Sequence, residues 1–275
     1  MRQTEALAIL NAGANVFLTG APGAGKTYVL NEFIRQARAD GASVAVTAST
    51  GIASTHINGQ TIHSWSGVGV ATALSASLLK LIKSRRKRKI QATDILVIDE
   101  VSMLHAWLFD MVDQVCREVR RDPRPFGGIQ VVLSGDFFQL PPVVTERDSA
   151  LLMKFYPGNL QGWCFKSRYW TGFDFEPHVL KTVVRQSAPD FIDNLNRARV
   201  GDASCLDYFN AHSRSSRAYL PKDTLVLCAN NRIADSINRE NVDALDAPKV
   251  EFTAAVTGMV NSGDKMAPER IVIGL

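Results

Sequence analysis

A glycine-rich octapeptide near the N-terminus constrains the fold more than any other feature of this 275-residue chain. Residues 20–27 read GAPGAGKT, which fits the pattern G-x-x-x-x-G-K-S/T, and they follow an apolar run at residues 16–19. A strand that leads through such a loop into a helix directs several main-chain N–H groups at phosphate oxygens, at the positive end of the helix. The sequence therefore predicts a phosphate-binding loop inside a βα unit.

Each part of this loop has an expected role in holding a nucleoside triphosphate. Lys26 brings a positive charge to the outer phosphates, and the hydroxyl of Thr27 is a ligand for Mg²⁺. The tight turn that cradles the phosphates is expected from the following residues: Gly20, Pro22, Gly23, Ala24 and Gly25. A glycine-rich turn without a ligand is the alternative, and the strand and helix on either side disfavour it.

Short apolar runs alternate with helical stretches along the first half of the chain. Strands are expected at residues 16–19, 43–48, 95–98 and 129–133. One helix is expected to end near residue 38, and another to span residues 104–120. The pattern predicts an α/β fold of the P-loop NTPase class, a mostly parallel sheet with helices on both faces. Residues 67–93 depart from it and are expected to be an insertion.

A second region is expected after an irregular aromatic stretch at residues 149–175. A helix is predicted at residues 189–200, a strand at 224–228 and a helix at 233–245. These elements are too few to close a sheet. We therefore expect residues 1–175 to form one domain and residues 176–275 to form only part of a second.

Two carboxylates follow the predicted strand at residues 95–98. Ligands of parallel sheets bind beyond the carboxyl ends of the strands, so Asp99 and Glu100 are expected to face the phosphate loop. Asp99 would hold Mg²⁺, and Glu100 would accept a proton from the attacking water. A polar strand end or a helix cap is the alternative, and the position downstream of a phosphate loop favours the catalytic interpretation.

A polar segment, SGDFFQLPP at residues 134–142, follows the fourth predicted strand. Gln139 is the candidate γ-phosphate sensor, because its amide can bond the terminal phosphate or the attacking water. A capped turn is the alternative, since Asp136 directly after Gly135 also suits that geometry.

Composition argues against several other classes of protein. No apolar run approaches the roughly 20 residues needed to span a bilayer, and residues 1–5 lack the apolar core of a signal peptide. A cytoplasmic, membrane-free protein is expected. The four cysteines form no C-x-x-C pair, so neither a disulfide framework nor a zinc site is indicated: Cys116, Cys164, Cys205 and Cys228.

Charge alone does not identify a partner. The net charge of +4 permits binding to nucleic acid without requiring it. Six basic residues fall within positions 83–89, and such a run is more often a solvated helix end than a phosphate contact.

Taken in order, these segments resemble the Pif family of superfamily 1 DNA helicases. GAPGAGKT resembles helicase motif I, IDEVSML (98–104) motif II and LSGDFFQLPPV (133–143) motif III. TASTGIAS (47–54) with GQTIHSW (59–65) resembles the single-strand-binding motifs Ia and Ib, and LKTVVRQ (180–186) resembles motif IV. Residues 108–121 followed by PFGGIQ (125–130) resemble the Pif signature segment, which is more specific than the phosphate loop.

The resemblance implies a RecA-like motor domain at residues 1–175 and the start of a second one at residues 176–275. It implies ATP and Mg²⁺ as cofactors and keeps the roles given above to Lys26, Thr27, Asp99, Glu100 and Gln139. It adds Gln3, seventeen residues before Gly20, as the residue that reads adenine.

The resemblance also assigns an arginine finger and a DNA surface. Arg185 would reach the nucleotide from the second motor domain, although a surface salt bridge is what this arginine would suggest alone. Thr50, Gly51, His63 and Trp65 are the candidate contacts to single-stranded DNA. For Trp65, packing in the core is an equal alternative.

The implied activity is ATP-driven 5′-to-3′ translocation on single-stranded DNA and unwinding of forked duplex DNA. A monomer near the nucleoid is expected, acting in DNA repair, recombination, or telomere and replication-fork maintenance. Nothing in the sequence resembles motifs V and VI of the family, so we expect nucleotide binding with weak turnover.

Two alternatives stay open. One is a nucleotide-dependent DNA-binding module without motor activity. The other is a different P-loop NTPase, RecD-like or AAA-type, which would be favoured if Gln3 and PFGGIQ lay far from the nucleotide and DNA surfaces.

Overall fold

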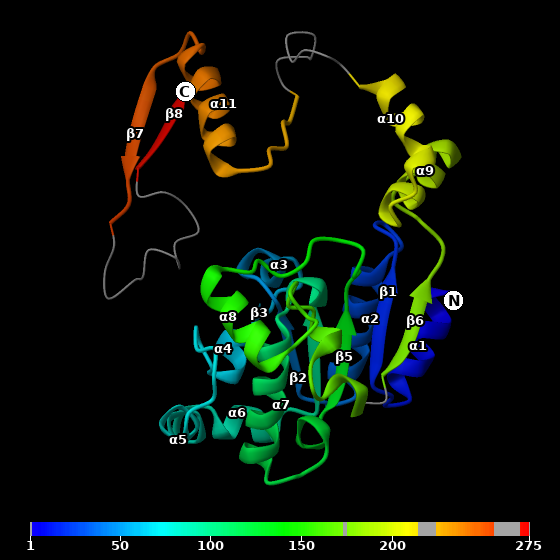
Figure 1. Cartoon of the computed structure of the whole chain (residues 1–275), viewed down its shortest axis with the longest axis vertical. Helices are drawn as coiled ribbons and strands as arrows, with labels where there is room; N and C mark the ends of the chain where they lie inside the picture. The colour runs from blue at the N-terminus through cyan, green and yellow to red at the C-terminus, as the bar shows by residue number, and fades with distance from the viewer. Residues whose placement is uncertain (1, 173–174, 214–223, 256–269, 275) are drawn as a thin grey trace. The chain divides into compact units, whose positions relative to one another are not determined.

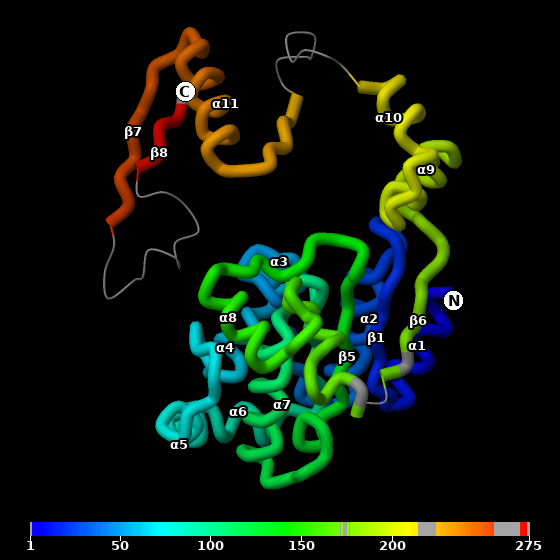
Figure 2. The backbone as a smooth tube through the Cα atoms, in the orientation of Figure 1, coloured from blue at the N-terminus to red at the C-terminus, as the bar shows by residue number. Residues whose placement is uncertain are grey.

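The computed structural model describes residues 2–172, 175–213, 224–255 and 270–274, and the chain divides into two compact units, Met1–His212 and Ser213–Leu275 (Figures 1 and 2). Among the described residues, no helix combines the length and the apolar character that crossing a membrane requires.

A six-stranded parallel sheet forms the centre of the first unit. The strand order is β3-β2-β4-β5-β1-β6, and every neighbouring pair is parallel. The expected parallel α/β sheet is confirmed. Its strands are β1 (Val16–Gly20), β2 (Val44–Ala48), β3 (Gln60–Thr61), β4 (Ile95–Asp99), β5 (Gln130–Ser134) and β6 (Glu176–Leu180).

Helices cover both faces of this sheet (Figure 1). The helices of the first unit are α1 (Gln3–Asn11), α2 (Lys26–Ala39), α3 (Gly51–His56), α4 (Ile62–Ser66), α5 (Ala76–Arg85), α6 (Lys87–Ala92), α7 (Ala106–Arg120), α8 (Glu146–Phe155), α9 (Pro189–Arg199) and α10 (Leu206–His212). Single 3-10 turns lie at η1 (Val101–Met103), η2 (Pro125–Gly128), η3 (Cys164–Lys166), η4 (Trp170–Gly172) and η5 (Ala203–Cys205).

The central strand β4 shows why the chain adopts this layered form. All five of its residues are buried, as a parallel strand covered on both faces requires. Leu96 and Ile98 pack in the core cluster under α7, whereas Ile95 and Val97 pack in the cluster under α1 and α2. Alternate side chains therefore anchor opposite helical layers, because successive residues of a strand point to opposite faces.

The insertion expected at residues 67–93 contains α5 and α6, which pack against α7. Ile82 of α5 and Ile90 of α6 are buried in the core and anchor the two helices there. The basic run covers the end of α5 and the first half of α6. Within it, Lys83 pairs with Glu118 at 2.8 Å, and most of the other basic side chains are exposed, which agrees with a solvated helix surface.

The expected domain boundary at residues 175/176 lies too early. Strand β6 pairs with β1 along its whole length, so residues 176–180 complete the first sheet, and the first unit extends to His212.

The second unit contains α11 (Asn231–Asp243) and the antiparallel pair β7 (Lys249–Thr253) and β8 (Arg270–Gly274). The predicted helix at 233–245 is confirmed as α11, whose first turn is capped by the Asn230 side chain. The predicted strand at 224–228 is wrong. Leu225 and Leu227 are 84% and 90% exposed, and these residues have no strand beside them among the described residues with which to form a ladder.

Candidate nucleotide-binding site

The phosphate loop connects the end of β1 to the start of α2, as predicted. Gly23 and Gly25 both have left-handed backbones, with φ of 81° and 86°. A β-carbon on Gly23 would lie 2.7 Å from the β-carbon of Arg185, and one on Gly25 would collide with the side-chain amide of Gln3. Glycine is therefore required here for two reasons: the strained turn, and the close approach of two other segments of the chain.

Lys26 opens α2 and lies within electrostatic reach of several charged groups. Its ammonium donates to the carbonyl oxygens of Gly20 at 2.8 Å and Ala21 at 3.4 Å. Burial lowers the pKa of Lys26, and the carboxylates of Asp136, Glu100 and Asp99, in that order, act against the shift. Three carboxylates, two at the end of β4 and one after β5, thus influence the charge of the lysine of the loop.

Asp99 and Glu100 stand at the carboxyl end of β4, as predicted. Asp99 is buried, and one of its carboxylate oxygens accepts the main-chain N–H of Glu100 at 2.9 Å. Burial, and after it the charge of Asp99, raises the pKa of Glu100, while Lys26 lowers it. A carboxylate with a raised pKa takes up a proton more readily, which suits a general base.

Glu100 also has a left-handed backbone, with φ of 52° and ψ of 45°. Such a conformation costs a non-glycine residue about 1–3 kcal/mol and is found often at active sites. The hydroxyl of Ser49 donates to the Glu100 carbonyl at 2.8 Å, so a neighbouring segment stabilises the turn.

The segment after β5 forms the capped turn and also presents the predicted sensor. The buried carboxylate of Asp136 accepts the main-chain N–H of Phe138 at 3.2 Å and the Gln139 side-chain amide at 3.3 Å. Gln139 itself is exposed. The two interpretations of this segment are therefore compatible, because the cap is what holds the candidate sensor.

A cavity of about 430 Å³ adjoins the phosphate loop, and Gln3 forms part of its wall. The Gln3 amide donates to the carbonyl of Ala24 at 3.5 Å, which places the side chain against the loop. Such a volume suits a small-molecule pocket, and an amide at its wall can pair with the edge of a base. The cavity is lined by Arg2, Gln3, Thr4, Ala24, Leu180, Thr182 and Val184.

Arg185 lies beside the phosphate loop, but it does not come from a second domain. It belongs to the first unit and follows β6, whose partner β1 leads directly into the loop. Because the two strands are parallel and adjacent, the residues after β6 must pass beside Gly23. The main-chain N–H of Val184 donates to the Gly23 carbonyl at 2.9 Å, which fixes this arrangement.

Three of the four candidate DNA contacts are accessible. Thr50 caps α3 by accepting the N–H of Ala53 at 3.2 Å, and Gly51 is exposed beside it, just beyond the carboxyl end of β2. His63 is half-buried on α4, and burial, followed by the neighbouring His105, lowers its pKa.

Trp65 is different: it is fully buried in the core. Its ring cannot stack on a base, so its assignment to DNA is wrong and the alternative of core packing is confirmed. Helix α4 buries Ile62, Trp65 and Ser66 on one face, at spacings of three and four residues. His63 falls outside that face.

The segment PFGGIQ leads into the amino end of β5, whereas the phosphate loop follows the carboxyl end of the neighbouring parallel strand β1. Its Gln130 amide donates to the carbonyls of Leu10 and Ala14, both at 2.9 Å. The main-chain N–H of Phe126 donates to the buried carboxylate of Asp113 on α7 at 2.7 Å. This segment therefore lies far from the phosphate loop, whereas Gln3 lies against the loop. The hydrogen bonds of the segment tie α1 and α7 to the sheet.

Arg199, at the end of α9, was missed by sequence reasoning. It forms two 2.7 Å hydrogen bonds with Asp136. An arginine in the last turn of a helix is ordinary, so no local signal distinguished it.

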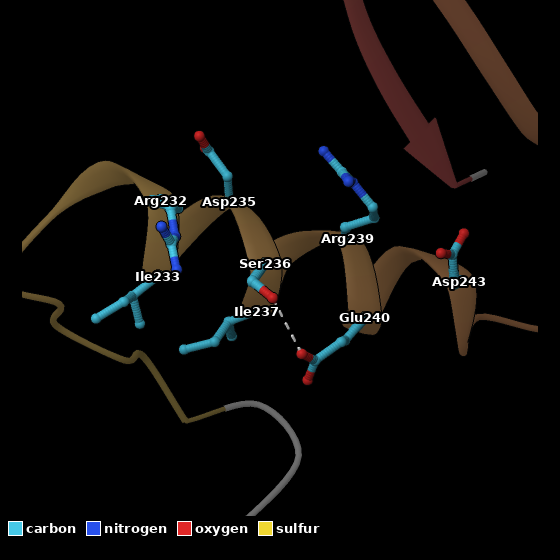
Figure 3. A pocket seen from close by; sticks show the side chains of 8 residues that line it. All are labelled: Arg232, Ile233, Asp235, Ser236, Ile237, Arg239, Glu240 and Asp243. Carbon is cyan, nitrogen blue, oxygen red and sulfur yellow. Dashed lines mark hydrogen bonds between the residues drawn. The ribbon is translucent and has the colours of Figure 1, made fainter.

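A larger hollow of about 810 Å³ lies along α11 in the second unit and contains none of the predicted site residues (Figure 3). One hydrogen bond, from Ser236 to Glu240, crosses its wall at 3.3 Å. The lining residues are Arg232, Ile233, Asp235, Ser236, Ile237, Arg239, Glu240 and Asp243.

Comparison with known proteins connects this geometry to one family. Residues 2–206 match the family model described as PIF1-like helicase. The "ATP-dependent DNA helicase Pif1" of Psychrobacter sp. (strain PRwf-1) is 39% identical over 267 residues, which cover 94% of this chain and 39% of that protein.

Solved structures agree. The crystal structure of Pif1 helicase from Candida albicans superimposes with a TM-score of 0.84 at 30% identity, covering 99% of this chain and 62% of that one. Pif1 helicase from Bacteroides, in complex with ADP-AlF3 and single-stranded DNA, superimposes with a TM-score of 0.73 at 26% identity, covering 98% of this chain and 63% of that one. The chain thus spans less than two thirds of the length of each of these proteins.

Proposed function

Because the chain belongs to the PIF1-like helicase family, we propose that it binds ATP, Mg²⁺ and single-stranded DNA as part of a DNA helicase motor. One observation carries the proposal: Gln3, Lys26, Glu100 and Arg185 come from four separate segments and meet around a single phosphate loop. A glycine-rich turn without a ligand gives no reason for this convergence.

ATP binding is supported by the parts of the loop. The triphosphate would receive main-chain N–H groups at the start of α2 and the ammonium of Lys26. The adenine would enter the cavity beside Gln3, next to Ala24. The Bacteroides protein of similar fold was solved with ADP-AlF3.

The residues at the end of β4 fit a magnesium ion. Mg²⁺ prefers oxygen ligands and is usually held by one or two carboxylates together with phosphates and water. Asp99 and the exposed hydroxyl of Thr27 supply that chemistry. Ser134 is the last residue of the neighbouring strand β5. Its hydroxyl is buried and has no hydrogen-bond partner in the described structure, so this oxygen is unused. Bound Mg²⁺ would neutralise charge on the phosphates.

Hydrolysis would use three further side chains. Glu100 would accept the proton of the attacking water, and Gln139 would orient that water or the γ-phosphate. Arg185 would stabilise the charge that develops on the phosphoryl group.

DNA binding would use the surface at the carboxyl end of β2 and the start of α4. Thr50 and Gly51 present a hydroxyl and main-chain groups suited to phosphate contact without regard to sequence, and His63 would contact a base. The finer parts of the proposal follow the family alone: 5′-to-3′ movement, unwinding of forked duplex DNA, action as a monomer near the nucleoid, and a role in repair, recombination or telomere and fork maintenance.

A second candidate function is a nucleotide-dependent DNA-binding module without motor activity. It is favoured by the location of the phosphate loop and its partners, which all lie in the first unit. On this view these residues bind nucleotide, and no DNA-stimulated turnover accompanies the binding.

Steady-state ATP turnover with and without oligo(dT) distinguishes the two functions. DNA-stimulated turnover that disappears in Lys26→Ala supports the motor function. Binding of an ATP analogue and of oligo(dT) without stimulated turnover supports the binding module. Absence of nucleotide binding contradicts both.

A further inference from the structure

Two anchors hold the segment between β6 and the end of α9 across the phosphate loop. The first is the hydrogen bond from the Val184 N–H to the Gly23 carbonyl, at 2.9 Å. The second lies at the last residue of α9, where the Arg199 guanidinium donates from Nε and Nη2 to the two carboxylate oxygens of Asp136, both at 2.7 Å. Arg185 lies between the two anchors.

The second anchor has a well-defined geometry rather than that of a loose surface pair. The Asp136 side chain is fully buried, and that of Arg199 is only 20% exposed. The guanidinium carbon also lies 4.5 Å from the centroid of the Phe138 ring. A two-pronged, charge-assisted bond with an aromatic ring over the cation fixes both the distance and the orientation of the arginine.

The same carboxylate organises the candidate γ-phosphate sensor. Asp136 accepts the Gln139 amide at 3.3 Å on the oxygen that also accepts Arg199 Nε. Burial acts to raise the pKa of Asp136, but the bonds from Arg199, Phe138 and Gln139 bring it below its ordinary value, so the group stays ionised. Asp136 and Arg199 both influence the pKa of Lys26, in opposite directions, which places the bridge within electrostatic reach of the phosphate loop.

We propose that Arg199 is a positioning residue for γ-phosphate recognition. Its bridge to Asp136 holds both Gln139 and the segment that contains Arg185 in place beside the phosphate loop. This inference rests on the proposed ATP site and adds a residue to it. Without the bridge, Gln139 would lose its anchor, and so would the end of α9, which closes the segment that contains Arg185. Contacts to the α- and β-phosphates, which the loop makes by itself, would stay.

Arg199→Lys is the first test, because it keeps the charge and removes the two-pronged geometry. Binding of ADP and of a non-hydrolysable ATP analogue would be measured by titration calorimetry in the presence of Mg²⁺. We expect the unsubstituted chain to prefer the analogue, and Arg199→Lys to lower that preference by roughly tenfold while ADP affinity is maintained. Arg197→Lys is the matched control, since Arg197 lies on the same helix and pairs with Asp193 instead.

Asp136→Asn combined with Arg199→Gln is the second variant, because removing both charges leaves no unpaired buried carboxylate to unfold the protein. We expect this double variant to stay folded and to lose the preference for the analogue. The proposal is overturned if either variant keeps the full preference, if Arg199→Lys weakens ADP and analogue equally, or if the unsubstituted chain binds both equally. A chain that binds neither nucleotide contradicts the proposed function itself, and the role of Arg199 with it.

Discussion

The side-chain amide of Gln3 fills the space in which a β-carbon on Gly25 would lie. The two residues are 22 positions apart in the chain, yet the first turn of α1 packs onto the left-handed turn that begins α2. In the proposed ATP site, contact between this amide and the phosphate loop would link recognition of the base to binding of the phosphates.

Replacing Gln3 by Ala should reduce selection for adenine. We expect ATP affinity to fall roughly three- to tenfold, because one or two neutral hydrogen bonds are lost. The ratio of ATP to GTP affinity should approach one. Gln36→Ala is the control, since the Gln36 amide donates to Glu32 on α2. An unchanged ATP-to-GTP ratio in Gln3→Ala would contradict the adenine assignment.

Replacing Lys26 by Ala should weaken ATP binding by roughly 100-fold, the effect of losing a charged hydrogen bond to phosphate. Fluorescent-nucleotide titration measures the loss, and urea denaturation checks that the chain stays folded. Lys80→Ala, on the exposed side of α5, should bind ATP like the unsubstituted chain. Equal affinity of the two variants would rule out the phosphate role.

Replacing Glu100 by Gln should separate binding from turnover. The amide cannot accept the proton of the attacking water, so we expect turnover to fall at least ~100-fold with ATP affinity nearly unchanged. Single-turnover hydrolysis with oligo(dT) measures this. Turnover equal to that of the unsubstituted chain would exclude Glu100 as the general base.

The same variant should change the pH dependence of stability. Burial raises the pKa of Glu100 in the folded chain, so between its ordinary value of 4.5 and the raised value the folded state binds more protons than the unfolded state. The free energy of unfolding contributed by Glu100 therefore falls as pH rises through this window. Glu100→Gln should be more stable than the unsubstituted chain at pH 7.5 and equally stable below pH 4.5, as measured by urea denaturation. The opposite trend would refute the raised pKa.

His63 and Trp65 should respond differently to substitution. Trp65→Ala should lower the free energy of unfolding by about 3–5 kcal/mol, because it leaves a large cavity in the core. His63→Ala should leave stability nearly unchanged and weaken oligo(dT) binding roughly tenfold, as for loss of a base contact. Anisotropy with labelled oligo(dT) and urea denaturation test both. Full DNA affinity in His63→Ala would remove this residue from the proposed DNA surface.

Replacing Asp113 by Ala should destabilise the first unit by about 3 kcal/mol, because Arg117 and the Phe126 N–H lose a fully buried partner. Asp113→Asn should cost less, since its amide oxygen can still accept from Phe126. Glu118→Ala, an exposed change on the same helix, should leave the denaturation midpoint close to that of the unsubstituted chain. A midpoint equally unaffected by Asp113→Ala would show that the bond between α7 and η2 is dispensable.

The predictions made from sequence were accurate where the information is local. The phosphate loop, the acids after β4 and the apolar face of α7 depend on residues a few positions apart, so their spacing along the chain already places them together. The strand predicted at residues 224–228 failed because a strand depends on a partner that local alternation does not supply.

Contacts between distant segments followed from packing instead. The pairing of β6 with β1 carries Arg185 to Gly23, and it could not be inferred because nothing in residues 176–180 specifies which strand they join. The burial of Trp65 and the bridge from Arg199 to Asp136 depend likewise on how helices settle against the sheet. The spacing of residues along the chain and the hydrophobic periodicity thus determine which chemical groups lie at the end of each strand. The packing of strands and helices against one another determines which of those groups meet.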